Sequence, residues 1–297
     1  MENLYTHQSA NVWKTWFLMT VFFVFIIALG WLFSQAYGNS IILYVAVGVS
    51  LVMNIASYWW SDKVVIKMTG AHPAEKKEYF ELFTTVENLT ITAGLPMPKV
   101  YVINDPAPNA FATGRNKNHA VVAVTTGLLS ILNRTELEGV IAHELSHIGN
   151  KDMLVSTVVV VLVGFISILA DLFLRMAHFG GINNDRDSKA GGVLIILALI
   201  AAILAPISAT LIQLAISRKR EFLADSSGAL LTRYPDGLAS ALQKIGSYSR
   251  PMARANTATA HLFISNPFGG SGKFFLKLFM THPPVEERVR ALIGSKK

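Results

Sequence analysis

Four long runs of apolar residues interrupt the otherwise mixed pattern of hydrophobic and polar positions along this chain. The runs cover roughly residues 16–33, 41–60, 153–174 and 193–216. Each approaches the length of about 20 residues that an α-helix needs to cross a bilayer. A short polar stretch joins the first two runs and a longer polar loop joins the last two, so the pattern predicts two membrane hairpins. A cleaved signal peptide is the alternative for the first run, but a second run follows it too closely for that pattern.

Shorter periodicities outside these runs predict a small domain of mixed α and β structure. Three short stretches bounded by turn residues predict strands at 99–103, 109–113 and 120–125, and the first and third of these are rich in β-branched residues. Apolar residues at helical spacing predict helices over 73–93, 235–247 and 285–293. Pro73 suits the first turn of the first of these helices. Thr135, with Glu138 three residues later, matches a capping box, which predicts that another helix starts there.

The composition supports a membrane protein. Hydrophobic residues make up 52% of the 297 positions and charged residues only 15%, whereas about a quarter of the residues in a soluble domain are charged. The net charge of +7 suits basic residues that flank membrane spans and face anionic lipid headgroups. Because no nucleic-acid motif or pattern of basic and aromatic residues is present, we expect a lipid bilayer and no nucleic acid among the partners. The absence of cysteine excludes disulfides, thiolate metal ligands and a cysteine nucleophile.

The distribution of basic residues predicts the orientation in the membrane. Lys63, Lys67, Lys76 and Lys77 follow the second run, and the basic cluster 218–220 follows the fourth. The turn inside the first hairpin carries no lysine or arginine. Cytoplasmic segments of membrane proteins are enriched in Lys and Arg. We therefore expect both termini, and the domain between the hairpins, to lie in the cytoplasm.

Residues 140–149 read VIAHELSHIG and carry the most specific chemical pattern of the chain. His143 and His147 stand at i and i+4, so both imidazoles share one helix face and can bind one metal ion. Glu144 lies about 100° round the helix from His143, where it can act as general base on a water at that metal. This H-E-x-x-H arrangement is typical of zinc proteases. A polar helix face that matches the motif by chance is the alternative.

A stable zinc site needs a further ligand. The third run enters the membrane just after His147, and the fourth run returns to the same membrane surface just before Glu221. We therefore expect Glu221 near the helix that carries His143 and His147. Glu221 and Asp225 again stand at i and i+4. This spacing predicts Glu221 as the third ligand and Asp225 as the acceptor for the second N–H of a ligand histidine. A salt bridge from Glu221 to Arg218 on the same helix is the alternative.

Several separated motifs resemble those of a known family. AHELSHIGNKDM precedes the third run, SRKREFLADSSGA follows the fourth, and NAFATG and FMTHPPVEERVRAL lie outside the runs. Together they resemble the HtpX-type membrane zinc metalloproteases, gluzincins related to the CAAX prenyl endoprotease, and the resemblance covers essentially the whole chain. It implies a bacterial cytoplasmic (inner) membrane endopeptidase with one Zn²⁺ per chain. Its substrates would be membrane or misfolded polypeptides, cut at the cytoplasmic face in stress-linked quality control.

The resemblance also implies roles for residues outside the metal motifs. One strand would line the cleft and pair with the substrate backbone: Asn109, Ala110, Phe111, Ala112 and Thr113. Asn109 and His282 are similar to catalytic residues that contact the scissile peptide or its tetrahedral intermediate. An edge strand that adds the substrate as an extended strand gives broad specificity, because backbone groups make the contacts.

The fold expected from all these features is an α-helical integral membrane protein with four transmembrane helices and an α+β gluzincin-like zinc protease domain with a small β-sheet. Its expected parts are an N-terminal hairpin, a first protease segment, a second hairpin and a second protease segment, at residues 1–60, 61–152, 153–216 and 217–297. A membrane scaffold or chaperone with a vestigial metal site is the rival interpretation. The intact Glu144 argues against it, because a structural site needs only ligands. Natural substrates and oligomeric state do not follow from the sequence.

Overall fold

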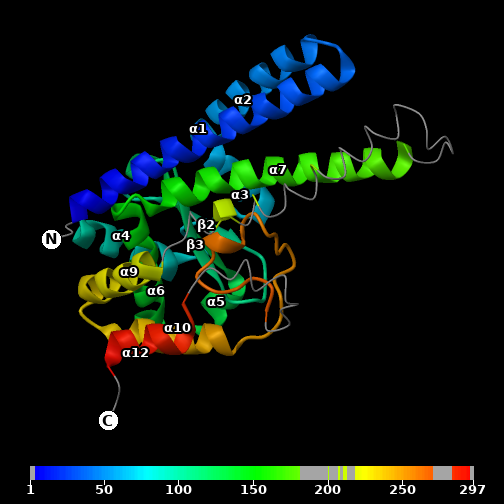
Figure 1. The fold of residues 1–297 in the computed structure, drawn as a ribbon. Coiled ribbons are helices and arrows are strands. Elements are labelled where there is room, and N and C mark those ends of the chain that lie inside the picture. The colour runs from blue at the N-terminus through cyan, green and yellow to red at the C-terminus, as the bar shows by residue number, and fades with distance from the viewer. Residues whose placement is uncertain are drawn as a thin grey trace.

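Three long helices form the upper part of the molecule (Figure 1). A computed structural model describes residues 4–180, 200, 207, 210–212, 218–269 and 283–294. Within this part of the chain, three helices are long and apolar enough to cross a membrane: α1 (Leu4–Tyr37), α2 (Ile41–Trp59) and α7 (Asp152–Gly180). The first three predicted spans are therefore confirmed as helices. The fourth, 193–216, lies outside the described residues apart from 200, 207 and 210–212.

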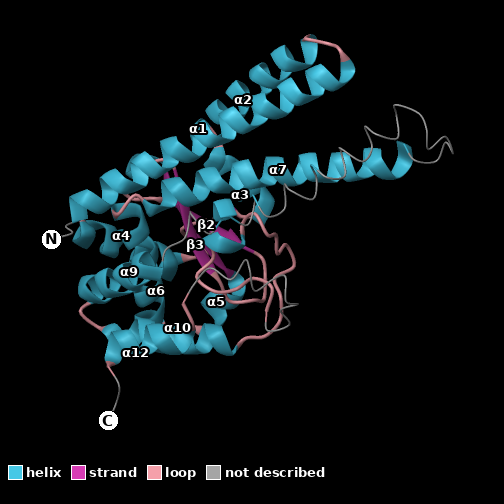
Figure 2. Ribbon diagram, in the orientation of Figure 1, coloured by secondary structure: helices cyan, strands magenta, loops and turns pink. Residues whose placement is uncertain are grey.

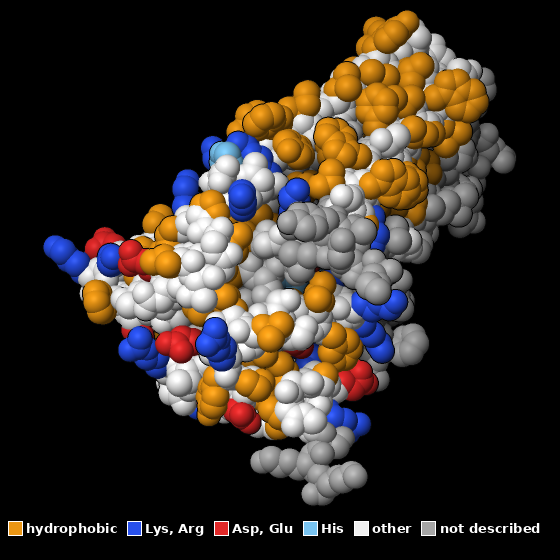
Figure 3. All heavy atoms as spheres, turned by 90° about the vertical axis from the view of Figure 1, so that its left-hand side faces the viewer, with side chains coloured by type: hydrophobic (Ala, Val, Ile, Leu, Met, Phe, Trp, Pro, Cys, Tyr) orange, Lys and Arg blue, Asp and Glu red, His pale blue; other side chains and the backbone are white. Residues whose placement is uncertain are grey.

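The hairpin of α1 and α2 leans away from the rest of the molecule and presents an apolar surface. Hydrophobic side chains gather over this arm, whereas charged side chains gather on the opposite end of the same face (Figure 3). The exposed large side chains of the hairpin include Trp16, Trp31, Tyr44, Val52 and Trp59. Helices that are apolar all round lie in a core or in lipid, and such a large exposed apolar patch marks a membrane or protein contact. The hairpin therefore has the surface of a membrane segment.

Helix α7 belongs to both parts of the molecule. In its most apolar stretch 61% of the residues are buried, against 11% in α2. It lies between the hairpin and the smaller elements below it (Figure 1). The hydroxyl of Thr157 on α7 hydrogen-bonds that of Thr113 in the sheet at 2.9 Å. Part of this span therefore also forms a wall of the domain beneath the hairpin.

A four-stranded sheet lies under α7, among helices (Figure 2). Its strands β1 to β4 are ordered β1-β2-β4-β3, with β2 and β4 parallel and both outer pairs antiparallel. Their bounds are His72–Pro73, Lys99–Ile103, Ala110–Gly114 and Ala120–Thr125. The three predicted strands are confirmed to within one residue, and β3 stands at an edge. Because every residue of β3 and β4 is buried, and so are residues on both faces of these strands, this side of the sheet forms the centre of the domain.

The predicted helix over 73–93 was wrong at its start. The backbone N–H of Ala74 donates to the carbonyl of Val100 at 3.0 Å, so the chain at Pro73 runs as the short strand β1 beside β2. The helix α4 begins only at Phe80. Proline suits a first helical turn, but it is equally acceptable on an edge strand, and the pairing with β2 decides between the two.

The other helices of the described residues pack on the sheet or on one another. They are α3 (Ser61–Thr69), α4 (Phe80–Ala93), α5 (Thr126–Ile131), α6 (Arg134–Gly149), α9 (Arg218–Thr232), α10 (Pro235–Ser247) and α12 (Val285–Ile293). Short 3₁₀ turns lie at Lys117–His119 and Ala260–Leu262. The predicted helices α10 and α12 are confirmed. One apolar cluster joins the sheet to α4, α6 and α10, which fixes the position of α6 beneath the strands.

The start of α6 also differs from the prediction. Asn133 is the N-cap: its Oδ1 accepts from the N–H of Glu136 at 3.0 Å, and Glu136 Oε2 accepts from the N–H of Asn133 at 2.8 Å. The predicted pair, Thr135 and Glu138, lies two residues too late. Both pairs fit the spacing of a capping box, but Glu136 also accepts from Ser240 and Lys244 of α10. The pair of Asn133 and Glu136 therefore fixes the start of α6, and Glu136 connects this start to α10.

Candidate metal centre and active site

Helix α6 directs two histidines to one point. The Nε2 atoms of His143 and His147 lie 3.2 Å apart. His143 is buried, and its side chain is 1% exposed, against 16% for His147. Two residues at i and i+4 on a helix face the same way, as the sequence predicted.

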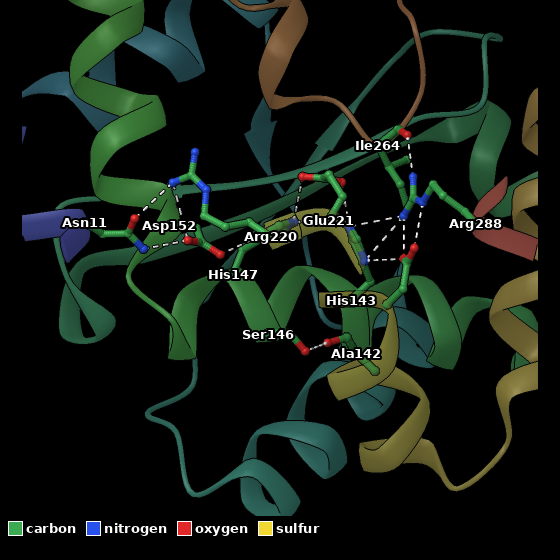
Figure 4. A network of polar contacts seen from close by, with 11 residues as sticks. Asn11, Ala142, His143, Ser146, His147, Asp152, Arg220, Glu221, Ile264 and Arg288 are labelled. Atoms are coloured by element: carbon green, nitrogen blue, oxygen red, sulfur yellow. Dashed lines mark hydrogen bonds and ion pairs between the residues drawn. The ribbon is translucent and has the colours of Figure 1, made fainter. Parts of the chain in front are cut away.

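Helix α9 brings Glu221 to the two histidines (Figure 4). Its carboxylate oxygens lie 3.8 Å from Nε2 of His143 and 3.7 Å from Nε2 of His147. One ligand atom from each of the three residues falls within 4.8 Å of the others. Tetrahedral Zn²⁺ with bonds of about 2.0–2.1 Å would separate its ligand atoms by roughly 3.3 Å. The donor set therefore fits a tetrahedral divalent cation in both chemistry and spacing.

The position of Glu221 also bears on the alternative given above, a salt bridge from Glu221 to Arg218 on the same helix. Arg218 is exposed on α9, whereas Glu221 is buried toward α6. A buried carboxylate needs compensating positive charge or a cation. The three predicted ligands thus meet, although they come from α6 and from a helix far along the chain.

Asp225 lies one turn after Glu221 and contacts the other ring nitrogen of His143. Its Oδ1 is 2.9 Å from His143 Nδ1. Arg288 of α12 donates to the same carboxylate with both Nε, at 2.9 Å, and Nη2, at 2.6 Å. Burial opposes the charge on Asp225, but the hydrogen bonds from Arg288 and His143 outweigh it and hold the pKa of Asp225 well below its usual range. Asp225 therefore stays a carboxylate and orients the imidazole of His143.

Arg288 was not identified from the sequence, although a signal was present. It is 1% exposed and stands on the face of α12 that also carries the apolar residues Val285, Val289 and Leu292. An arginine in a helical apolar stripe is rarely buried without a partner. That position could have directed attention to a buried ion pair.

We expect Arg288→Ala to destabilise the protein by about 3–5 kcal/mol, because removing one partner of a buried ion pair leaves the other charge uncompensated. Thermal unfolding in detergent measures this change. Arg290→Ala is the matched control, since Arg290 is exposed on the same helix. Equal unfolding temperatures for the two variants would contradict the role given to the Arg288 pair.

Glu144 lies beside the metal cluster and is 2% exposed. Burial raises the pKa of its carboxyl, and the positive fields of His143 and His147 partly oppose that rise. A general base works best when its pKa lies near the operating pH. The surroundings of Glu144 therefore suit proton transfer better than those of an exposed glutamate.

His147 has a strongly negative environment. Burial opposes its charged form, but the hydrogen bond to Asp152 and the charges of Glu221, Asp152 and Glu144 outweigh this and raise the pKa of His147 to about 9. The same negative surroundings favour a divalent cation between these groups. Asp152, whose Oδ2 is 3.1 Å from His147 Nδ1, was missed by the sequence reasoning. The sequence feature that could have identified Asp152 is its position, since it is an acidic residue at the start of a membrane-length helix.

The predicted substrate strand forms the edge strand β3, together with Asn109 just before it. Residues 109–113 are all buried. Ser265 donates its N–H to Asn109 Oδ1 at 3.1 Å, and Asn109 Nδ2 donates to the carbonyl of Ser265 at 3.0 Å. Ile264 donates its N–H to the carbonyl of Ala110 at 2.9 Å. Ile264 and Ser265 therefore lie along the edge of the sheet at Asn109 and Ala110. The other predicted contact residue, His282, lies outside the described residues.

Helices α6 and α9 pack closely because glycine stands at their crossing. A Cβ at Gly228 would lie 3.0 Å from the backbone nitrogen of His143, which is tighter than nine in ten real Cβ contacts. We expect Gly228→Val to cost about 1–3 kcal/mol through overpacking and to weaken metal binding by moving α9 away from α6. Thermal unfolding and a chelator titration measure the two effects. Gly164→Val on α7 is the control, because a Cβ there meets no atom within 4 Å. An unchanged metal affinity would argue against this close approach.

A buried cluster of two helical histidines and a glutamate beside membrane-length helices defines a class, the membrane metallohydrolases with an H-E-x-x-H helix. Comparison with protein families makes the assignment specific. The sequence model of Peptidase family M48 matches residues 76–296, and the chain belongs to this family. It is therefore a membrane metalloprotease that acts on polypeptides, and the family resemblance seen in the sequence is confirmed.

Curated relatives agree over nearly the whole chain. A Protease HtpX homolog of Caldanaerobacter subterraneus subsp. tengcongensis is 47% identical over 296 residues, which cover 98% of this chain and 97% of that protein. A Protease HtpX homolog of Desulfatibacillum aliphaticivorans is 49% identical over 290 residues, 96% of this chain and 90% of that protein. Because the matches include the N-terminal hairpin, the membrane helices belong to the common architecture.

A solved structure shows the same fold at lower identity. The crystal structure of S. mikatae Ste24p aligns with a TM-score of 0.50 and 18% identity, covering 97% of this chain. The chain spans 66% of the length of that protein. At this identity the likeness concerns the fold alone.

Proposed function

We propose that this chain is a zinc-dependent endopeptidase of the bacterial cytoplasmic membrane. It would cut membrane or misfolded proteins at the cytoplasmic face, as part of stress-linked protein quality control. The observation that carries the proposal is the meeting of His143, His147 and Glu221, with ligand atoms within 4.8 Å of one another, beside the buried carboxyl of Glu144. The name of the curated relatives, Protease HtpX homolog, supports the protease activity, and the quality-control role rests on the family resemblance.

Zinc is the cation that this donor set suits best. Two neutral imidazoles and one carboxylate are the protein ligands of many catalytic zinc sites, which keep a fourth position open. A divalent cation held there would lower the pKa of a water molecule and polarise the substrate carbonyl. His143, His147 and Glu221 would hold the cation, and Asp225 would orient the imidazole of His143.

Glu144 performs the proton transfer in this proposal. Its carboxylate takes a proton as water attacks the scissile carbonyl, and then passes that proton to the departing amine. Burial raises its pKa, which suits both steps near neutral pH. His282 or Asn109 would donate a hydrogen bond to the developing oxyanion. For Asn109 this requires its amide to leave the carbonyl of Ser265, to which it now donates.

The site would lie at the membrane surface on the cytoplasmic side. His147 precedes Asp152, the first residue of the span in α7, so the metal helix ends where the membrane helix begins. The basic residues at 63–77 and 218–220 favour a cytoplasmic location for both protease segments. The proposed division therefore remains two hairpins, 1–60 and 153–216, that hold the protease segments 61–152 and 217–297 against the bilayer.

Metal removal and readdition test the proposal. The full chain is purified in detergent with a chelator and then incubated with casein, before and after one equivalent of Zn²⁺. We expect hydrolysis to disappear with the chelator and return with zinc. Metal binding without hydrolysis would favour a scaffold or chaperone with a vestigial site. Hydrolysis that is insensitive to chelation would contradict the metal mechanism itself.

A further inference from the structure

A buried polar network joins the metal cluster to the first membrane helix (Figure 4). Asp152 contacts His147 Nδ1 through Oδ2 at 3.1 Å. Its other oxygen, Oδ1, accepts from Asn11 Nδ2 of α1 at 2.7 Å. Asn11 in turn accepts from Arg220 Nη1 at 3.1 Å. One carboxylate thus connects a proposed ligand to a helix that lies far earlier in the chain.

The network is buried as well as connected. Asn11 is 3% exposed, Asp152 5% and Arg220 8%. Arg220 directly precedes the proposed ligand Glu221 and lies 3.5 Å from Asp152. Polar residues in membrane-length helices are costly and usually serve a specific purpose. Asn11 also donates to the carbonyl of Asn150, at the end of the metal helix, at 3.2 Å. Its hydrogen bonds therefore go to residues that lie close in sequence to the proposed ligands His147 and Glu221.

We propose that Asp152 is a positioning residue for His147, and that Asn11 holds Asp152 in place, so that the N-terminal membrane hairpin is part of the metal site. This inference rests on the proposed function. The orientation of a ligand imidazole is set by the hydrogen bond of its other nitrogen. A carboxylate whose two oxygens have separate partners keeps one orientation, and Asn11 supplies the second partner.

Zinc affinity of single and double variants tests this role in the full chain. Competition with a chromophoric chelator measures the dissociation constant in detergent. Loss of an outer hydrogen-bond partner typically weakens metal binding by about 10–100-fold, which we expect for Asp152→Ala. Asn11→Ala should weaken binding less. The double variant should bind no more weakly than Asp152→Ala, because Asn11 acts through Asp152.

Matched variants separate positioning from folding. Asn54→Ala is the control, because Asn54 lies in the same hairpin and donates to Ser50 of its own helix; its zinc affinity should equal that of the wild type. Asp152→Asn preserves shape and a hydrogen-bond acceptor, so it should fold and show an intermediate affinity. Wild-type affinity in Asp152→Asn and Asn11→Ala, or additive losses in the double variant, would overturn the inference. A wild-type chain that binds no zinc would instead overturn the proposed function.

A second inference starts from the edge of β3. Alternate residues of an edge strand direct their backbone groups away from the sheet, and Ala110 directs its carbonyl to the N–H of Ile264. The carbonyl of Ile264 accepts from Arg288 Nη1 at 3.3 Å, and Arg288 also binds Asp225. A peptide added to this edge needs the same carbonyl of Ala110. The chain itself now fills that position.

We infer that Ile264 and Ser265 form an autoinhibitory strap that a substrate strand must displace. This inference also rests on the proposed function, because it concerns the edge proposed to bind substrate. The strap is packed in place: Phe263 lies edge-on to Phe111 with ring centres 5.2 Å apart, and Ile264 is 3% exposed. A peptide must therefore compete with the protein's own backbone at Ala110 and Asn109.

Hydrogen exchange tests displacement. Zinc-loaded Glu144→Gln, which should bind but not cut, is compared with and without a saturating peptide fragment of casein. We expect the amides of Ile264 and Ser265 to exchange about tenfold faster or more with peptide bound, because their acceptors are lost. The amide of Val122, inside β4, is the control and should not change. Continued protection of Ile264 and Ser265 with peptide bound would overturn the strap. A wild-type chain that hydrolyses nothing would count against the proposed function instead.

Discussion

Glu144→Gln is expected to lower the rate of peptide hydrolysis by about 10²–10⁴-fold, the usual contribution of a general base, while zinc content stays at the wild-type level. The substitution preserves the shape of the side chain and removes its ability to accept a proton. Glu144 is adjacent in sequence to His143 but is not one of the three clustered ligands. Glu144→Gln should therefore lower the rate of hydrolysis and leave the amount of bound zinc unchanged.

Two measurements on the same preparation check this expectation. Atomic spectroscopy gives the zinc content and casein digestion gives the rate. Glu138→Gln is the control, because Glu138 lies on the same helix and pairs with Arg134 at 3.1 Å, away from the cluster. If Glu144→Gln cleaved casein at the wild-type rate, another residue would have to act as the base. If it lost its zinc, Glu144 would have a role in holding the cation.

The residues that could hold a metal were identified from the sequence because their spacing is local. His143 and His147 share a helix face, and so do Glu221 and Asp225, whatever the rest of the fold does. The sequence argument for the meeting of the two pairs was an antiparallel pair of spans, and the second of these spans, 193–216, lies outside the described residues apart from 200, 207 and 210–212. Asp152 lies close to His147 in sequence, but the break between α6 and α7 places it at the imidazole, and no helical spacing predicts that.

Asn11 was beyond sequence reasoning for a different reason, because it contacts the site only through the tertiary packing of α1. The place of Arg288 in the apolar stripe of α12 indicated a buried partner, but only tertiary packing identifies that partner as Asp225. The errors at Pro73 and Thr135 have a related cause. In both cases a local signal fitted two positions, and pairing with a distant element decided between them, β2 for Pro73 and α10 for the capping residues. Local propensity is a weak guide where tertiary contacts compete with it.

Glu221→Ala is expected to remove the cation from the protein. Two histidines on one helix would remain, and the cluster would lose the carboxylate that lies 3.7–3.8 Å from both imidazoles. Loss of an outer partner costs about 10–100-fold in affinity, and loss of a direct ligand should cost more. Hydrolysis should fall with zinc occupancy and recover only in part at high zinc concentration.

The comparison of Glu221→Ala with Glu221→Gln identifies what the carboxylate supplies. The amide can still offer an oxygen but carries no charge, so its affinity should lie between those of the alanine variant and the wild type. Glu286→Ala is the control, since Glu286 is exposed on α12. Wild-type zinc content in Glu221→Ala would mean that a different residue completes the site. If Glu221→Ala loses its zinc and Glu144→Gln retains it, the two glutamates have different roles. Glu221 then holds the cation, and Glu144 transfers the proton.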